Sequence, residues 1–239
     1  MENIHIFIIL AFVAEVLGTV GGFGSSLFFV PIASYFIDFH SVLGITALFH
    51  VSSNLTKIVL FRHGFDKNII VWVGIPAVIF VVVGAYLSRF ANTELLETLL
   101  GYFLIGISLL FFFYRNIKIE PNRKNSLLGG IFSGLAAGLL GTGGAIRGLT
   151  LASYQLKIEV FIATSAVIDL AIDSSRAVVY SLNGYVHKHD LYLIPILLVV
   201  SILGTLVGKQ ILAKISEEKF KIIVLAMIFL TGIFSLIGL

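Results

Sequence analysis

The stretch GITALFHVSSNLTKIVL, residues 44–60, decides the fold of this chain, together with its counterpart ATSAVIDLAIDSSRAVV, residues 163–179. Each stretch is apolar apart from a few polar side chains, four of which are spaced four, four and three residues apart. They are Thr46, His50, Asn54 and Lys57 in the first stretch, and Ser165, Asp169, Asp173 and Arg176 in the second. This spacing places each set along one face of a helix. Because a charge that faces lipid at the bilayer centre costs roughly 2.5–3.5 kcal/mol, both faces are predicted to point inward, toward each other or a shared aqueous cavity, as in a transporter site.

The two stretches belong to a longer internal repeat with an offset of 119 residues. Residues 22–59 align with residues 141–178 without a gap, and seven of the 38 aligned positions are identical. Glycine-rich turns stand at the start of both, GGFGSS at 21–26 and GTGGA at 141–145. The rare polar positions coincide in an otherwise apolar chain, and this coincidence predicts two structural repeats.

The composition predicts a membrane protein. The sequence is 58% hydrophobic and 12% charged, whereas soluble domains carry roughly 25% charged residues. Apolar runs of helical length recur from end to end, which favours an all-α polytopic membrane protein over a soluble domain with one anchor. The absence of cysteine excludes disulfides, thiol catalysis and cysteine-ligated metals. The net charge of +3 does not imply a nucleic-acid partner, and neither a cofactor nor a metal site is predicted.

Ten apolar segments divide evenly about a basic linker. They lie at 4–20, 25–37, 42–61, 69–90 and 95–114, and then at 127–140, 145–156, 160–181, 190–213 and 219–239. We therefore expect a first transmembrane repeat at 1–114, a cytoplasmic linker at 115–126 and a second transmembrane repeat at 127–239. The first two segments of each half are short, which predicts helices that break or re-enter the membrane at the glycine-rich turns.

The positions of lysine and arginine predict the orientation of the chain in the cell (inner) membrane. The side that holds the linker collects most of them, including Arg62, Lys67, Arg123 and Lys124, whereas the other side holds chiefly Arg89 and Lys188. The linker is therefore expected in the cytoplasm and both termini outside. With an odd number of crossings in each half, the second repeat enters from the opposite face. Such inverted repeats support alternating access.

The glycine-rich turns are candidate anion sites. A helix that starts at membrane depth offers free N–H groups and the positive end of its dipole to an anion, and glycine lets a ligand approach the backbone closely. The candidate substrate-binding residues here are Gly22, Phe23, Gly24, Ser25 and Ser26 in the first half, and Gly141, Thr142, Gly143 and Gly144 in the second. The alternative is that these glycines only permit tight helix packing.

Charged and amide side chains on the two stretches complete the predicted substrate site. Lys57 and Arg176 are equivalent in the repeat, and they are accompanied by Asn54 and Asp173. Arginine presents a fork that suits an oxyanion, while lysine acts as a point charge. Arg147, where the first half has Phe28, could contact substrate from one side only. The competing interpretations are structural ion pairs with the aspartates, or a lysine that snorkels to the boundary.

Charge balance raises the question of proton coupling. Lys57 and Arg176 balance Asp169 and Asp173, and a neutral cavity attracts a bare anion only weakly. A proton taken up by Asp169 or His50 would let anion and proton move together. Glu15 has no polar counterpart, because position 134 is glycine, and it is either a proton-handling carboxylate or the partner of a nearby cation.

These features together resemble the sulfite exporter TauE/SafE family of membrane transporters. The resemblance covers nearly the whole chain. It rests on Gly21-Gly22-Phe23-Gly24, on Gly141-Thr142-Gly143-Gly144, and on the helices that carry Asn54-x-x-Lys57 and Asp173-x-x-Arg176. It implies transport, by export or uptake, of sulfur-containing anions such as sulfite, thiosulfate or organosulfonates. Arg147 has no place in the general pattern of the family, so selectivity could differ here.

Three other functions compete with anion transport. A proton- or cation-coupled carrier of another solute would bind its ion through Glu15, Asp169 and Asp173. An intramembrane serine hydrolase would use Ser25 or Ser26 as nucleophile and His50 as base, which requires hydrogen-bond contact between them. A purely structural membrane protein would not need matched intramembrane charges. The partners expected are a small anion and lipid, and the sequence leaves the coupling ion and the oligomeric state open.

Overall fold

A computed structural model describes residues 3–22, 24–61, 64–113 and 120–214, with the single positions 229 and 233. Within these residues the chain is helical and contains no strand, as expected for an all-α protein. Phe23 and nearly all of the segment expected at 219–239 lie outside the described residues.

The first half contains α1 (Ile4–Gly21), α2 (Ser26–Ala33), α3 (Phe39–Leu60), α4 (Lys67–Ile69), α5 (Ile75–Ser88) and α6 (Thr93–Phe113). A π-helical stretch, Ile70–Gly74, joins α4 to α5 just before Pro76. The second half contains α7 (Arg123–Leu140), α8 (Gly144–Ala152), α9 (Ile158–Leu182) and α10 (Leu193–Leu212), with a 3-10 turn at Lys188–Asp190. The helix α7 starts four residues before the expected segment at 127, so the end of the expected linker is already helical.

The helix ends repeat at the offset found in the sequence. The ends of α1 and α7 differ by 119 residues at both termini, and α3 and α9 start 119 residues apart. Each of α1 and α7 is followed directly by a glycine with left-handed backbone, Gly22 at φ 68° and Gly141 at φ 74°. A side chain is strained at such a φ, which explains why glycine occupies both positions.

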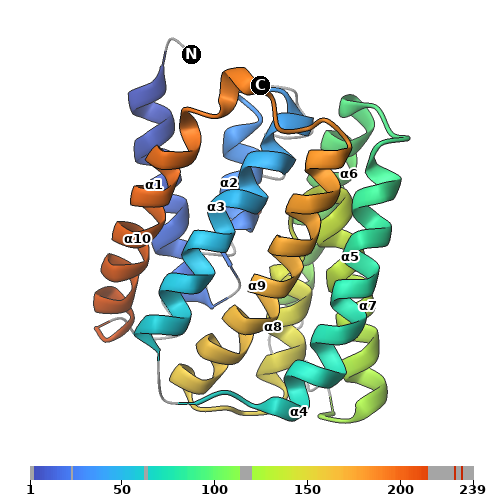
Figure 1. Cartoon of the computed structure of the whole chain (residues 1–239). Helices are drawn as coiled ribbons and strands as arrows, with labels where there is room; N and C mark the ends of the chain where they lie inside the picture. The colour runs from blue at the N-terminus through green and yellow to red at the C-terminus, as the bar shows by residue number, and fades with distance from the viewer. Residues whose placement is uncertain are drawn as a thin grey trace.

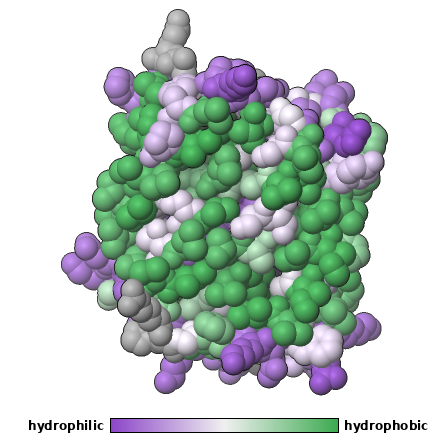
Figure 2. All heavy atoms as spheres, in the orientation of Figure 1, coloured by the Kyte–Doolittle hydropathy of each residue, from purple (hydrophilic) through white to green (hydrophobic). Residues whose placement is uncertain are grey.

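The helices are those of a membrane protein. Among the described residues, five helical stretches are long and apolar enough to cross a bilayer: Ile4–Gly21, Phe39–Leu60, Lys67–Ser88, Thr93–Leu110 and Leu193–Leu212. The helices α2 and α8 have only 8 and 9 residues, or about 12–14 Å at 1.5 Å per residue, and cannot span a core of about 30 Å. Figure 2 shows a broad hydrophobic middle with hydrophilic residues gathered at both ends of the molecule.

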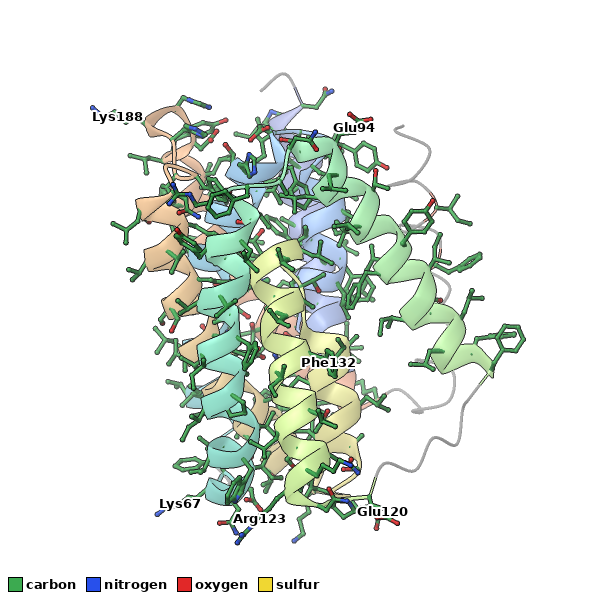
Figure 3. All side chains as sticks on the ribbon, turned by 90° about the vertical axis from the view of Figure 1, so that its right-hand side faces the viewer. Lys67, Glu94, Glu120, Arg123, Phe132 and Lys188 are labelled. Atoms are coloured by element: carbon green, nitrogen blue, oxygen red, sulfur yellow. The ribbon has the colours of Figure 1, made fainter. Side chains whose placement is uncertain are left out.

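Helices from the two halves pack against each other in equivalent pairs: α1 with α10, α5 with α7, and α3 with α9. The N-terminus marks one end of the bundle (Figure 1), and Glu94 and Lys188 lie at that same end in the view turned about the vertical axis (Figure 3). Lys67 and Arg123 lie at the opposite end (Figure 3). The helices α1 and α7 therefore begin at opposite ends of the bundle.

The short helix α2 is held in place by aromatic packing. The ring of Phe29 lies against Phe7 of α1 and Phe49 of α3, with centroids 5.8 and 4.7 Å away. These ring contacts anchor α2 to two long helices, α1 and α3. The N-terminus of α2 then lies beside the polar faces of α3 and α9.

Candidate functional site

A small cavity lies where the starts of α2 and α8 meet the polar faces of α3 and α9. Its volume is about 20 Å³, which is space for water. The lining residues are Gly24, Ser25, Ser26, His50, Asn54, Lys57, Ala137, Gly141, Gly143, Gly144, Arg147, Asp169, Ile172, Asp173 and Arg176. Most of the residues predicted to bind substrate are therefore brought together by the fold.

Two helix N-termini face this cavity. The N-cap residues are Ser25 for α2 and Gly143 for α8. The first N–H groups of a helix lack partners within it and attract negative charge. A Cβ at position 143 would lie 2.0 Å from the carbonyl oxygen of Ser133, so glycine is needed for α8 to begin here. Ser26 donates a hydrogen bond to Thr142 Oγ1 at 3.2 Å, which joins the two breaks directly.

Six charged side chains at the cavity form three buried ion pairs. Lys57 Nζ lies 3.0 Å from Glu15 Oε1, and Arg176 Nε lies 2.8 Å from Asp173 Oδ1. Arg147 makes a bidentate pair with Asp169, in which Nη2 donates to Oδ2 at 2.6 Å. Arg147 and Glu15 thus enlarge the expected set of four charges to six, and the total remains neutral.

Arg176 is the most firmly held of the three cations. Besides its pair with Asp173, its Nη1 donates to the carbonyl oxygens of Ala137 at 3.3 Å and Gly141 at 2.8 Å. These carbonyls belong to the end of α7, where helical partners are missing. The side chain therefore caps a broken helix as well as lining the cavity.

Arg147 is held by side chains. Its Nε donates to Ser165 Oγ at 3.2 Å. Among the described residues, its other polar contacts are with Asp169. It is 2% exposed. Since side chains can rotate without breaking a helix, Arg147 can be released from its partners more readily than Arg176.

Glu15 is completely buried and lies behind the lining of the cavity, in a cluster that we call the Glu15 cage. Four hydroxyl groups donate to its carboxylate: Ser53 at 2.5 Å, Ser25 at 2.6 Å, Thr205 at 3.0 Å and Thr19 at 3.1 Å. Lys57 binds both the carboxylate and Ser53 Oγ, the latter at 2.7 Å. The lysine is 6% exposed, so it does not snorkel to the boundary.

His50 connects the cage to the pair formed by Arg176 and Asp173. Its Nε2 lies 2.8 Å from Ser25 Oγ, and its Nδ1 lies 3.2 Å from Arg176 Nη2. The contact with Ser25 is the one that the hydrolase interpretation requires. However, a guanidinium can only donate, so Nδ1 accepts and the proton of the neutral ring sits on Nε2. In this state His50 donates to Ser25, Ser25 donates to Glu15, and the histidine is not a base for the serine.

The two polar helix faces meet through residues that the repeat makes equivalent. Asn54 Nδ2 donates to Asp173 Oδ2 at 2.7 Å, across 119 positions of sequence. This contact lies on the α3–α9 interface. His50 and Asp169, the two candidates for proton uptake, both line the cavity but have separate hydrogen-bond partners.

Some predicted positions lie outside the lining. Gly22 and Thr142 support the breaks behind the cavity, and Phe23 lies outside the described residues. Sequence reasoning missed Thr19, Ser53 and Thr205. Ser53 precedes Asn54, and Thr19 lies one helical turn after Glu15, so both carried a local signal. The approach of Thr205 from α10 depends on the tertiary fold.

One group of metal-ligand types lies away from the cavity. His187, His189 and Asp190 place ligand atoms within 4.8 Å of one another, next to Lys188 at one end of the bundle (Figure 3). His187 Nδ1 is 2.7 Å from Ser41 Oγ, so this ring already has a partner. The group is not part of the cavity.

Comparison with known proteins identifies a family and a relative of this chain. The model of the sulfite exporter TauE/SafE family matches residues 7–235. A protein of Methanocaldococcus jannaschii, named "Probable membrane transporter protein", is 27% identical over 253 residues, covering 96% of this chain and 94% of the relative. No solved structure matches the chain significantly.

Proposed function

Because the chain belongs to the sulfite exporter TauE/SafE family of membrane transporters, we propose that it is a secondary transporter of a small sulfur-containing oxyanion. Sulfite, thiosulfate and small organosulfonates are the substrates considered. The chain would move them across the inner membrane by alternating access. The observation that carries this proposal is the cavity in which two helix N-termini meet three buried cations.

The donors around the cavity suit an oxyanion. The first turns of α2 and α8 offer backbone N–H groups, and Arg147 offers a planar fork. Several convergent donors and positive charge are what a sulfur oxyanion needs when it leaves water. Arg147 is the residue proposed to bind the substrate most directly, because only the side chains of Asp169 and Ser165 compete for it among the contacts described.

Arg176 has a different role in this proposal. Its contacts with Ala137 and Gly141 hold the end of α7 against α9. It would supply positive potential while keeping the second break in shape. Loss of transport on its substitution would therefore not distinguish binding from folding.

Alternating access is supported by the arrangement of the two halves. The helices α1 and α7 are equivalent in sequence and begin at opposite ends of the bundle (Figures 1 and 3). Lys67 and Arg123 lie together at one end of the bundle, as the predicted cytoplasmic side requires, and Lys188 lies at the other end (Figure 3). We propose on this basis that the halves are inverted repeats with the linker in the cytoplasm.

Counterflow in proteoliposomes tests the proposal, with a panel of sulfite, thiosulfate, sulfoacetate, sulfate and chloride. The test variant is Arg147→Gln with Asp169→Asn, which removes one ion pair and keeps the cavity neutral. The control is Arg89→Gln, an arginine outside the cavity that stacks on Tyr86 and Phe90. We expect wild type and control to exchange at least one sulfur oxyanion, and the double variant to lose it. Exchange of none of these anions by folded, reconstituted wild type would reject the proposal.

A further inference from the structure

Resting on the proposed anion transport, we propose that the Glu15 cage is a binding site for a sodium ion. The ligands are the carboxylate of Glu15 and the hydroxyl oxygens of Thr19, Ser25, Ser53 and Thr205. In the present state the Lys57 ammonium occupies the cage. The site becomes available when Lys57 turns toward the anion, so that anion and sodium move together.

The cage is built from four separate parts of the chain. Its hydroxyls come from α1, from the turn before α2, from α3 and from α10, and all of them reach one fully buried carboxylate. Oxygen atoms are the ligands that hard cations prefer. A hydroxyl that donates to Glu15 in the absence of a metal ion can turn and present its lone pairs to a cation instead.

Close approach of α1 and α10 makes this geometry possible. A Cβ at Gly204 would lie 2.8 Å from the Cβ and Cγ of Glu15, and one at Gly208 would lie 2.7 Å from the Cβ of Thr19. Both positions therefore require glycine for the helices to meet at this distance. Thr205, between them, is thereby brought to 3.0 Å from the carboxylate.

Lys57 belongs to both the cage and the cavity. Its Nζ contacts Glu15 and Ser53, and the residue also lines the space between the two helix breaks. The side chain is a compact charge on a flexible four-carbon stem. An anion in the cavity competes with Glu15 for this charge.

The energetics link the two ions. If Lys57 turned to the anion alone, Glu15 would remain as an unpaired buried charge, which is strongly unfavourable. A cation in the cage removes that penalty and restores neutrality, because the six resident charges already cancel. By linkage, each ion then raises the affinity for the other.

The other two pairs do not offer the same site. Asp173 is bound by the amide nitrogen of Asn54 and by Arg176, and Asp169 is bound by Arg147 and a single hydroxyl, that of Ser165. Nitrogen donors have no lone pair for a cation. The repeat counterpart of Glu15 is Gly134, so we assign one sodium ion to each chain.

Sodium fits the cage better than a proton does. Four hydroxyl oxygens and the carboxylate of Glu15 form an all-oxygen ligand set of the kind that a hard metal cation needs, whereas a proton needs only one of these oxygens. The charged or titratable neighbours of the cage among the described residues are Lys57 itself and, beyond Ser25, His50. Neither supplies a carboxylate that would share a proton with Glu15.

The first test does not require the anion. In Lys57→Met the cage is vacated permanently, so the purified variant should be stabilised by sodium chloride over choline chloride at equal ionic strength. We expect a rise in Tm of roughly 2–4 °C for sodium moderately above its Kd, and none in Lys57→Met with Glu15→Gln. Equal Tm values in both salts, or stabilisation by low pH alone, would overturn the sodium site.

A second test uses wild type and covers the case in which Lys57→Met does not fold. Counterflow of sulfite is measured at fixed pH with sodium or choline on both sides. We expect exchange to require sodium, Thr205→Ala to raise the sodium concentration needed at least several-fold, and Thr205→Ser to retain the wild-type requirement. Sulfite exchange that is indifferent to sodium would overturn the inference and leave anion transport standing. Absence of sulfite exchange would count against the proposed substrate, and the Tm test would still decide the cage.

Discussion

The α1–α10 contact and the α5–α7 contact occupy equivalent places in the two halves, and the first contains the fully buried carboxylate of Glu15. In the α5–α7 contact, glycines of α7 lie against backbone: a Cβ at Gly134 would be 2.3 Å from the carbonyl oxygen of Ala77, and one at Gly138 would be 2.3 Å from that of Val81. In the α1–α10 contact the glycines lie on α10, and they face the side chains of Glu15 and Thr19.

The difference shows how one packing solution can serve two purposes. Small residues let membrane helices approach closely in both contacts. On the α5–α7 side the space is filled by the partner backbone, and the result is a tight scaffold. On the α1–α10 side the same closeness surrounds a buried carboxylate with hydroxyl groups and a lysine. We infer that the sodium ion binds beside the α1–α10 contact and that the α5–α7 contact serves as a rigid scaffold.

The largest loss of stability is expected when one partner of the ion pair between Glu15 and Lys57 is removed. Glu15→Gln and Lys57→Met should each lower the free energy of unfolding by about 3–5 kcal/mol, because each leaves one buried charge without its partner. The double variant should recover most of this loss. Thermal unfolding of the purified proteins in sodium-free buffer measures the coupling, and additive losses in the double variant would show that the two residues act independently.

The second largest loss of stability is expected at the α5–α7 contact. Gly134→Ala should destabilise the protein by about 1–3 kcal/mol, because the added methyl group meets backbone that cannot rotate away. Gly106→Ala on α6 is the matched control, since a Cβ there meets nothing within 4 Å. It should stabilise by roughly 0.5–1 kcal/mol. Equal Tm changes in the two alanine variants would contradict the close approach of α5 and α7.

Gly204→Ala should destabilise the protein less than Gly134→Ala does, and it should also alter the sodium dependence of transport. The methyl group would lie 2.8 Å from the Cβ and Cγ of Glu15, a smaller overlap than the 2.3 Å to backbone at Gly134, and we expect about 1 kcal/mol of destabilisation. Because Glu15 is displaced, sulfite counterflow should require more sodium, whereas Gly134→Ala should leave the sodium requirement unchanged in the folded fraction. Titration of transport against sodium separates the two variants.

The smallest effect is expected where the two helix breaks touch. Thr142→Val removes the acceptor for Ser26, and loss of one neutral hydrogen bond costs about 0.5–1.5 kcal/mol. The position lies behind the cavity, so the order of preference among the anions should not change. A reordered preference would place Thr142 in contact with the substrate.

The repeat and the polar faces could be predicted from the sequence because they depend on local spacing. The four-residue steps from Thr46 to Asn54 define a helix face without knowledge of the fold, and the left-handed glycines at 22 and 141 mark the ends of α1 and α7. The bounds of the short helices were less accurate: α2 ends at Ala33 rather than near 37. Aromatic packing continues past this helix end, since the ring of Phe36 lies 5.5 Å from that of Phe7, so the apolar run is longer than the helix.

The pairing of the charges could not be predicted, because it depends on tertiary contacts between helices distant in sequence. From spacing alone, the charges of Lys57 and Arg176 were expected to balance those of the two aspartates. In the structure, Lys57 forms its ion pair with Glu15, and Asp169 forms its ion pair with Arg147. Arg176 does pair with an aspartate, Asp173, three residues before it on the same helix.

Direct binding of a sulfur oxyanion tests the central claim most simply. Isothermal titration of sulfite, in sodium buffer, would compare wild type, Arg89→Gln, and the neutral pair Arg147→Gln with Asp169→Asn. The account predicts that wild type and Arg89→Gln bind sulfite at one site per chain, and that the cavity variant loses this binding while its Tm shows that it is folded. Unchanged binding in the cavity variant, or none in wild type, would contradict an anion site between the two broken helices.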